Sequence, residues 1–427
     1  MRYLHLFIAI LVAAFIGTAD AQNDSQEFGA DRGVTLDSVL HVISRHPLIL
    51  KRSAEVDAAR LRISQRSSLG DPMAMLGVEN LPTNSFRFDE EPMTSKMIGI
   101  TQMFPFFGKL STERSIAEKE VYSLQENSAE EENRLRRDIR LAFYDIYHLE
   151  QSIETNRNHL KSIAELIDLS EHAMAVGKGT QQDVLALKLE NAETRLRIPD
   201  EESMISMRLA DLAGASNMVI TQVRPDTASD LPKFDYDIAQ LDSLASLHRP
   251  ALLAMYSETE ASGFEIEKAR LMKYPDFSLG LFYMQRDAIA SMKQSDMVSA
   301  QLSFNLPIFS RKFSDAVSEQ EAMRTAKHEE INAMKLEIHT MLESLLRKME
   351  GLSSQFFILK QEILPLSLLS LATSRSNLQN GKATLNEVLR SELAVLHYMH
   401  SKYQLQADYN KAIAQIEYLV GIDLTIR

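Results

Sequence analysis

Two short segments carry polar side chains at a repeated spacing. AVGKGTQQDVL, residues 175–185, and LQNGKATLNEVL, residues 378–389, align without a gap. In each, a glycine precedes a threonine, and an acidic residue, Asp183 or Glu387, stands three positions after the threonine. Thr-x-x-acid is the capping box that begins a helix, and glycine suits the left-handed residue that ends the helix before it. The spacing predicts a tight turn between two helices, made twice, and the capping role does not exclude a contact with a partner.

The other candidates for chemistry are histidines and methionines. His397 and His400 lie three apart on a predicted helix and would share a metal, but two ligands without a third are more often surface histidines. The methionines at 73, 75, 93, 97 and 103 suit a soft metal such as copper or silver, and they equally suit the filling of strands and cores. The absence of cysteine excludes thiol chemistry and Cys-ligated zinc, and no nucleophile elbow, phosphate loop or HExxH motif occurs. We predict no enzyme activity, no catalytic or metal-ligating residue and no cofactor.

Very long helices must position the two turns. The 427-residue chain repeats itself at an offset of about 204 residues, as in GITQMFPFFGKL (99–110) and AQLSFNLPIFSRK (300–312). Helices are predicted from about 111 to 176 and from about 312 to 378, each roughly 100 Å long at 1.5 Å per residue. Their apolar residues recur every seven positions, which is typical of coiled-coil packing. The predicted core registers are Leu135, Ala142, Leu149 and Ile163 with Ile139, Ile146, Ile153, Leu160, Ile167 and Met174, and then Ile338, Leu345, Leu352, Leu359 and Leu366 with Leu342, Met349, Phe356 and Ile363.

Four strands are predicted before the long helices, two in each half. FSLGLFYM (277–284) and VSAQLSFN (298–305) alternate apolar and polar residues, and MAMLGVEN (73–80) and KMIGITQMF (96–104) form a noisier pair. Such alternation is typical of a membrane β-barrel, although each strand alone would suit a soluble sheet. Four strands cannot close a barrel and open edges are not tolerated in lipid, so copies of the chain must complete it, and three copies would give twelve strands. Pro105, Gly108 and Pro307 mark the predicted strand-to-helix transitions.

The first 21 residues, MRYLHLFIAILVAAFIGTADA, form a predicted signal peptide. The apolar run is shorter than a bilayer requires, and no later stretch is long enough to predict a transmembrane helix. The net charge of -13 makes nucleic acid an unsuitable partner. We predict an exported protein, with repeats at 22–222 and 239–427 joined by a linker at 223–238.

GDPMAMLGVENLP, MIGITQMFPFFGKL, the two glycine turns and the duplication together resemble the TolC-type outer-membrane efflux proteins over essentially the whole mature chain. QMFPFFGKL resembles the branch that works with cobalt-zinc-cadmium and copper-silver resistance pumps. The resemblance implies a mainly α homotrimer in which the duplicated hairpins form a helical barrel, continuous with a 12-stranded transmembrane β-barrel of four strands per chain. It also implies a periplasmic adaptor, an inner-membrane pump and outer-membrane lipid as partners. Many relatives carry a lipidated N-terminal cysteine, which this chain lacks.

By the same resemblance, the two turns are the periplasmic tips of the tunnel. Asp183 and Glu387 would ring a closable aperture, while the neighbouring tip residues would contact the adaptor. Those contact residues are Val176, Gly177, Lys178, Gly179 and Thr180, with Asn380, Gly381, Lys382, Ala383 and Thr384. The expected function is a passive exit duct of a tripartite efflux pump for heavy-metal cations. The alternatives are the exit duct of a type I protein secretion system and an exported coiled-coil adaptor outside the membrane.

Overall fold

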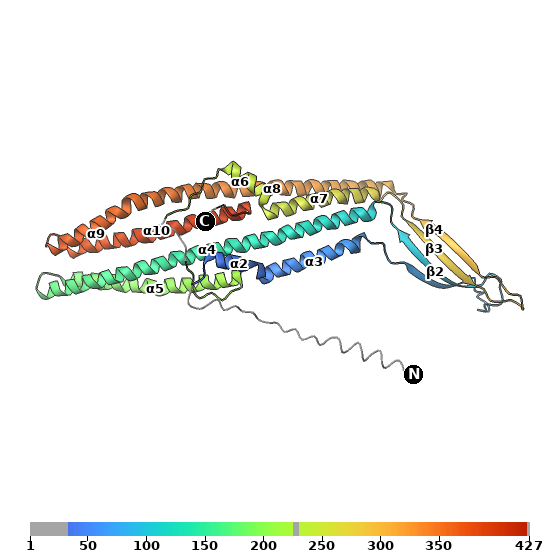
Figure 1. The fold of residues 1–427 in the computed structure, drawn as a ribbon, viewed down its shortest axis with the longest axis horizontal. Helices are drawn as coiled ribbons and strands as arrows, with labels where there is room; N and C mark the ends of the chain where they lie inside the picture. The colour runs from blue at the N-terminus through green and yellow to red at the C-terminus, as the bar shows by residue number, and fades with distance from the viewer. Residues whose placement is uncertain (1–32, 225–229, 425–427) are drawn as a thin grey trace, which may run out of the picture.

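A computed structural model describes residues 33–224 and 230–424. The predicted signal peptide, residues 1–21, lies outside the described residues, as does part of the predicted linker. The described chain is a long rod with the four strands at one end and two helical turns at the other (Figure 1).

The first half contains the longest helix. The 67-residue helix α4, Lys109–Ala175, runs from the strands to the first turn, and α5, Gln181–Ser216, returns beside it. This agrees with the helix predicted from 111 to 176. Before the strands lie α2 (Leu36–Val42), the short 3₁₀ helix η1 (Ile43–Arg45) and α3 (Pro47–Ser67).

The second half repeats this plan with one interruption. The elements α6 (Ile238–His248) and α7 (Pro250–Leu271) precede its strands, and α8 (Ser310–Ile358), α9 (Leu364–Gln379) and α10 (Leu385–Val420) follow them. Between α8 and α9, residues Leu359–Ile363 form a π-helical turn, η2. The single helix predicted from 312 to 378 is therefore interrupted by a π turn, although α8, η2 and α9 follow one another without a break in the chain of helical residues.

The π turn corrects part of the predicted core. A seven-residue repeat counted from Leu359 would bury Leu366, yet Leu366 is 65% exposed and Ser367, one position later, is buried. The other register shifts in the same way, because Leu364 is buried where Ile363 was expected. A π turn accommodates one extra residue, so each core position beyond it moves one residue along the chain. Met174, near the end of α4, is also exposed, since it lies in the last turn before the tip.

The strands form one antiparallel sheet in the order β1-β2-β3-β4. These strands are β1 (Met73–Glu79), β2 (Ser95–Phe104), β3 (Phe277–Gln285) and β4 (Met297–Phe304). The central pair joins the two halves of the chain, with Phe104 opposite Phe277. Within the described residues β1 and β4 each pair on one side only.

The register gives the sheet one continuous apolar face. Leu281 lies between Ile100 and Ala300, and Tyr283 lies between Ile98 and Val298. Large apolar side chains on this face are exposed in the single chain: Leu76, Val78, Ile98, Ile100, Leu279, Leu281, Tyr283, Val298, Leu302 and Phe304. The predicted alternation of β3 and β4 is confirmed, with the exception that Phe282 on the opposite face is buried against Gly99 and Gly280.

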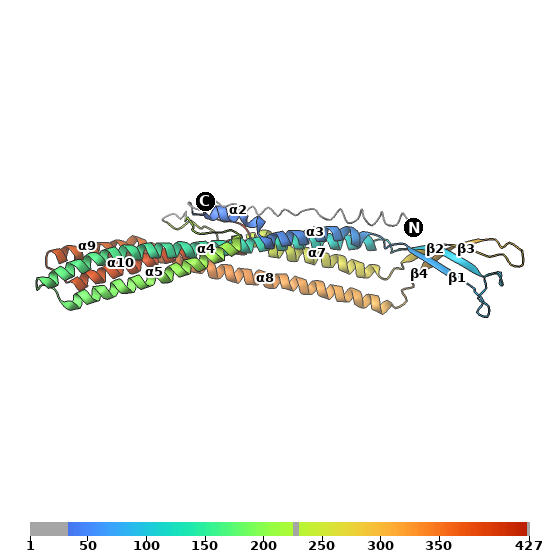
Figure 2. The same cartoon turned by 90° about the horizontal axis from the view of Figure 1, so that it is seen from below.

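Two main hydrophobic clusters hold the helices together. In the first half, α2 and α5 pack on α4 around the buried side chains of Ile139, Phe143 and Leu212. In the second, α6 and α10 pack on α8 around Leu342, Ile416 and Leu241. Figure 2 shows α8 separating from α3 and α4 toward the strands, where its surface is largely exposed.

One helical stretch differs from the sequence expectation about membrane spans. Within Ser310–Gln379 an 18-residue window reaches a mean hydropathy of 1.4, which by length and composition is enough to cross a membrane, and 17% of that window is buried. The expectation that no later stretch qualifies is wrong by this criterion. Length and composition alone are weak support for a span, and the exposed apolar side chains of this stretch equally suit packing against another helix.

Candidate functional site

The two tips adopt the same helix-ending turn. At the first, Gly177 has φ of +72°, and the amide of Lys178 donates to the carbonyl of Ala173 at 2.8 Å. At the second, Gly381 has φ of +67°, and the amide of Lys382 donates to Asn377 at 2.8 Å. Both patterns are Schellman motifs, which require a left-handed residue where a Cβ costs about 1 kcal/mol or more. The glycines therefore set the turn that presents the tip residues.

Both predicted capping boxes are present. The hydroxyl of Thr180 accepts from the amide of Asp183 at 3.2 Å, and the carboxylate of Asp183 accepts from the amide of Thr180 at 3.3 Å. At the second tip, Thr384 accepts from the Glu387 amide at 3.3 Å, and the Glu387 carboxylate accepts from the Thr384 amide at 2.8 Å. Each carboxylate therefore accepts a hydrogen bond from the N-cap amide of its own helix.

The structure brings the two tips into contact. The side-chain amide of Asn386 donates to the carboxylate of Asp183 at 3.2 Å. Behind this bond, Leu166, Leu187 and Val388 form a buried cluster to which both hairpins contribute. Asp183 and Glu387 therefore belong to one end of the chain, with Asp183 held by both hairpins. Sequence reasoning did not identify Asn386.

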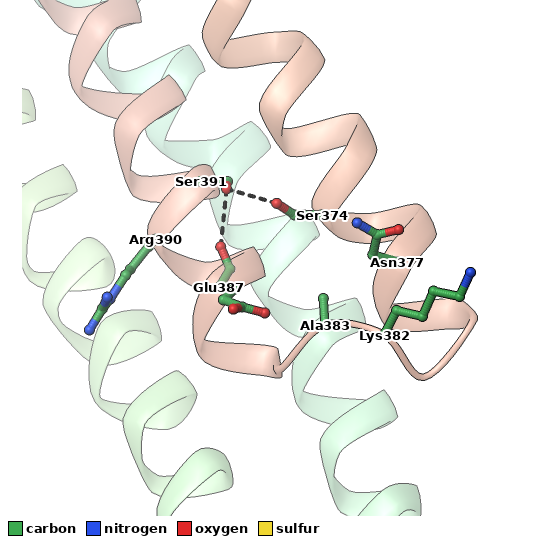
Figure 3. Close-up of a pocket in the computed structure, with 7 residues that line it drawn as sticks. All are labelled: Ser374, Asn377, Lys382, Ala383, Glu387, Arg390 and Ser391. Carbon is green, nitrogen blue, oxygen red and sulfur yellow. Dashed lines mark hydrogen bonds between the residues drawn. The ribbon is translucent and has the colours of Figure 1, made fainter.

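A shallow polar groove lies beside the second tip (Figure 3). Its volume is about 390 Å³, and its lining is Ser374, Asn377, Lys382, Ala383, Glu387, Arg390 and Ser391. Lys382 and Asn377 extend on one side of the turn and Arg390 on the other. The hydroxyls of Ser374 and Ser391 are 3.1 Å apart and tie α9 to α10. Lys382, Ala383 and Glu387 were named from the sequence, whereas the other lining residues carry no sequence signal and come together only through the hairpin.

Further from the tips, a buried charged cluster joins four helices. His159 on α4 is almost fully buried, with Nε2 3.5 Å from Glu190 of α5 and Nδ1 4.0 Å from Glu392 of α10. Arg375 of α9 donates to both carboxylate oxygens of Glu392 at 3.0 and 3.1 Å. Burial lowers the pKa of His159 below its ordinary value, although the carboxylates of Glu392 and Glu190 act to raise it. The Arg375–Glu392 ion pair lies within the second hairpin, and His159 of the first hairpin lies beside it, so polar side chains from both hairpins meet here.

His400 lies in a second buried polar network. Its Nδ1 is 2.8 Å from the hydroxyl of Ser152, and its Nε2 is 3.0 Å from Oδ1 of Asn156. Glu201 approaches the same two residues, at 2.5 Å from Ser152 and 2.9 Å from Asn156. Burial lowers the pKa of His400 to about 4, which favours the neutral ring, whereas the Ser152 hydroxyl donates to Glu201 and leaves both ring nitrogens facing acceptors, which favours the charged ring.

His397 and His400, which the sequence places three apart on one helix, have different surroundings in the structure. His397 is exposed beside Tyr398, whereas His400 is engaged in the network. Among the residues that the structure describes, no group of three or more His, Cys, Asp or Glu side chains is arranged to hold a metal ion.

The strand-to-helix transitions lie where the proline and glycine positions predict them. Pro105 directly follows β2, Gly108 is the N-cap residue before α4 with φ of +94°, and Pro307 lies between β4 and α8. Asp276, which sequence reasoning missed, organises this region. Its carboxylate accepts from the amide of Phe106 at 2.7 Å and from Lys109 at 2.7 Å, and thereby fixes the start of α4 to β3.

Comparisons with known proteins agree with this architecture. Residues 241–422 match the family model described as outer membrane efflux protein. A search of the curated proteins finds no significant match. Among solved structures, the outer membrane protein VceC from Vibrio cholerae is similar with a TM-score of 0.72 and 16% identity, covering 90% of this chain and 96% of VceC. CusC, described with transmembrane channel formation, has a TM-score of 0.76 and 14% identity, covering 91% of this chain and 92% of its own. The CmeC outer membrane channel of Campylobacter jejuni has a TM-score of 0.73 and 12% identity, covering 91% and 86%. At these identities the likeness shows the fold, which is that of outer-membrane channels.

Proposed function

We propose that the chain is an outer membrane efflux protein, the passive exit duct of a tripartite pump. The observation that carries this proposal is the joining of two features: a sheet with one exposed apolar face, and paired helical hairpins that extend far beyond it. The first suits a lipid boundary and the second a tunnel. The fold shared with outer-membrane channels over about nine tenths of the chain supports the same assignment.

The open sheet supports a homotrimer. Lipid does not satisfy unpaired strand edges, so β1 of one chain would pair with β4 of the next. Three copies give twelve strands, within the range of known membrane barrels, and six hairpins for a helical barrel. The chain would lie in the outer membrane, with its helices in the periplasm, and would reach it through the signal peptide at 1–21. Without cysteine it would not be lipidated through that residue.

The tips would meet the periplasmic adaptor. Residues 176–180 and 380–384, with the groove beside Lys382, are the exposed end of the rod furthest from the sheet. Asp183 and Glu387 would face their copies around the aperture. In this proposal the repeats at 22–222 and 239–427, joined by the linker at 223–238, each supply one hairpin and two strands.

The pump would supply the energy, so the duct itself requires no catalytic residue and no cofactor. For cargo we propose heavy-metal cations, on the strength of QMFPFFGKL and its resemblance to the metal-resistance branch. A type I secretion duct would share the mechanism and differ in cargo. An exported coiled-coil protein outside the membrane is less favoured, because it would leave the apolar face of the sheet in water.

Membrane fractionation followed by unheated gel electrophoresis of the detergent extract tests the duct. We expect a heat-sensitive trimer that remains with the outer membrane after washing in high salt. A monomer or dimer in the soluble periplasm would overturn the proposal.

Two neighbouring substitutions on β4 sharpen this test. Leu302 lies on the apolar face and Gln301 on the other. Leu302→Arg should prevent membrane assembly, because an arginine facing lipid costs about 2–4 kcal/mol near the bilayer centre. Gln301→Arg should leave the trimer in place, since its side chain would face water. Equal behaviour of the two variants would contradict the assignment of the faces.

A further inference from the structure

The second face of the sheet collects the methionines. By the alternation of the register, Met73, Met75, Met97, Met103, Met284 and Met297 all lie on the face opposite the apolar one. The apolar face has no methionine among its strand positions. The other positions of the methionine face include Ser278, Ser299, Gln301 and Ser303. Sulfur is therefore concentrated on the more polar side, where filling a hydrophobic core does not explain it.

Three of these residues form a row across the strands. Met97 of β2 is directly opposite Met284 of β3, and Met284 is directly opposite Met297 of β4. Directly opposed residues have Cβ atoms about 4.5–5.5 Å apart. Methionine side chains are unbranched and flexible, so three thioethers in such a row can reach one ion placed above the central one. We call Met97, Met284 and Met297 the methionine row.

The surroundings leave the row open. Met297 is 45% exposed, while Met97 and Met284 are half-buried. On β1 the position opposite Met97 is Gly77, and a Cβ there would lie 3.3 Å from the Met97 methyl group. The terminal methyl of Met97 therefore lies over a glycine, where it has room to turn toward Met284. A larger residue at position 77 would take that room.

The chemistry of the donors selects the ion. Thioethers are neutral, soft and polarisable, and they favour Cu(I) and Ag(I) over Zn(II), which prefers imidazole and thiolate. The negative charge of the chain, -13, favours cations in general and does not discriminate between them. We propose that the methionine row binds one soft monovalent cation, Cu(I) or Ag(I), through the sulfur atoms of Met97, Met284 and Met297.

This inference rests on the proposed function only in taking the methionine face as the inner wall of the duct. The methionine row would then be a binding site for soft cations on the exit path. It narrows the heavy-metal cargo to monovalent ions of this class.

Silver binding by the full-length protein in detergent tests the row. The probe is Ag(I) nitrate in chloride-free buffer, with bound silver counted by mass spectrometry after desalting and the affinity measured by calorimetry. We expect one Ag(I) per row, no comparable binding of Zn(II), and at least a tenfold loss of Ag(I) affinity in Met97→Leu/Met284→Leu/Met297→Leu. The control, Met204→Leu/Met207→Leu/Met323→Leu, changes three methionines that are exposed on helices and should bind as the unaltered protein does.

A single substitution gives a second test in case the triple variant misfolds. Met284→Leu removes only the central thioether, conserves volume, and should also weaken Ag(I) binding at least tenfold. Unchanged silver binding in both row variants, or no binding by the unaltered protein, would overturn the methionine row. If the row fails either test but the protein is still an outer-membrane trimer, the proposed duct function is unaffected. A soluble monomer would contradict the duct function whatever the silver result.

Discussion

At the scale of single residues, the main feature is the set of polar side chains buried where the two hairpins meet. Burial lowers the pKa of His148, His159 and His400. A histidine whose pKa is lower in the folded chain takes up its proton more readily when the chain is unfolded. These three residues therefore make the hairpin region less stable as the pH falls.

For His400 the pH window is defined. Its contribution is fully present above the ordinary histidine value of 6.5 and is lost as the pH falls toward about 4. A shift of this size corresponds to about 3 kcal/mol per chain at most. We expect His400→Gln to lose less stability than the unaltered protein between pH 7.5 and 5, as measured by urea unfolding with circular dichroism. Glu150, whose pKa is raised to about 7 by burial, acts in the opposite direction but is present in both proteins.

His339 provides a matched control on the surface. It is bonded to Asp242 at 2.7 Å, which raises its pKa, so it adds stability at low pH. His339→Gln should not reduce the acid loss. If His400→Gln and the unaltered protein lose stability equally, the network does not hold a neutral His400.

At the scale of helices and strands, the sequence predicted the long helices well because their cause is local. Both the heptad spacing and the two glycine turns can be predicted from residues close together in the sequence. The π turn was not predicted, although Pro365 marks its place. Proline has no amide hydrogen to donate to residue 361 of an α-helix, and η2 ends just before it. The backbone can respond to the missing hydrogen bond with a kink or with a π turn, and packing decides which. Because a π turn forms here, Ser367 takes the core position expected for Leu366.

The tip turns make a prediction at the same scale. In Gly177→Val/Gly381→Val, two β-branched residues would take the left-handed conformation, at a cost of about 1–2 kcal/mol each. We expect the tips to rearrange and pump-dependent resistance to fall, while the heat-sensitive trimer persists. Resistance is measured in a strain that depends on this protein.

The control is Gly351→Val, a glycine inside α8 with open space at its Cβ and no left-handed φ. It should leave resistance unchanged. Full resistance in the tip variant would argue against the turns as the adaptor contact.

At the scale of the whole molecule, a single chain leaves much apolar surface uncovered. Apolar side chains on either side of the π turn are exposed: Phe357, Ile358, Leu366, Leu368 and Leu369. The sequence predicted these segments as coiled-coil helices but could not say which partner covers which face, because heptad spacing is the same for contacts within a chain and between chains. The methionine face was hidden for a related reason: the row joins strands from the two halves, and only the register brings them together.

The proposed trimer predicts what covers this surface. Phe357→Gln/Leu369→Gln changes side chains that are 62% and 64% exposed in one chain. If they lie between protomers, the change should weaken assembly by about 1–3 kcal/mol per side chain and convert trimers to monomers on unheated gels and in analytical ultracentrifugation. Arg347→Gln, at an exposed polar position of α8, should assemble normally. Trimers of full stability in the double variant would place this surface outside the interface.

The pairing of β2 with β3 has a consequence for how the chain folds. β2 is complete early in the chain, yet its neighbour Phe277 follows two long helices and the start of the second repeat. Contacts between residues so far apart in sequence form slowly. If the chain is exported as the proposed function requires, β1 and β2 reach the periplasm before β3, and their apolar face stays uncovered because a two-stranded hairpin is barely stable alone. The first half of this protein should therefore be the client of periplasmic chaperones, and the arrival of β3 should end that dependence.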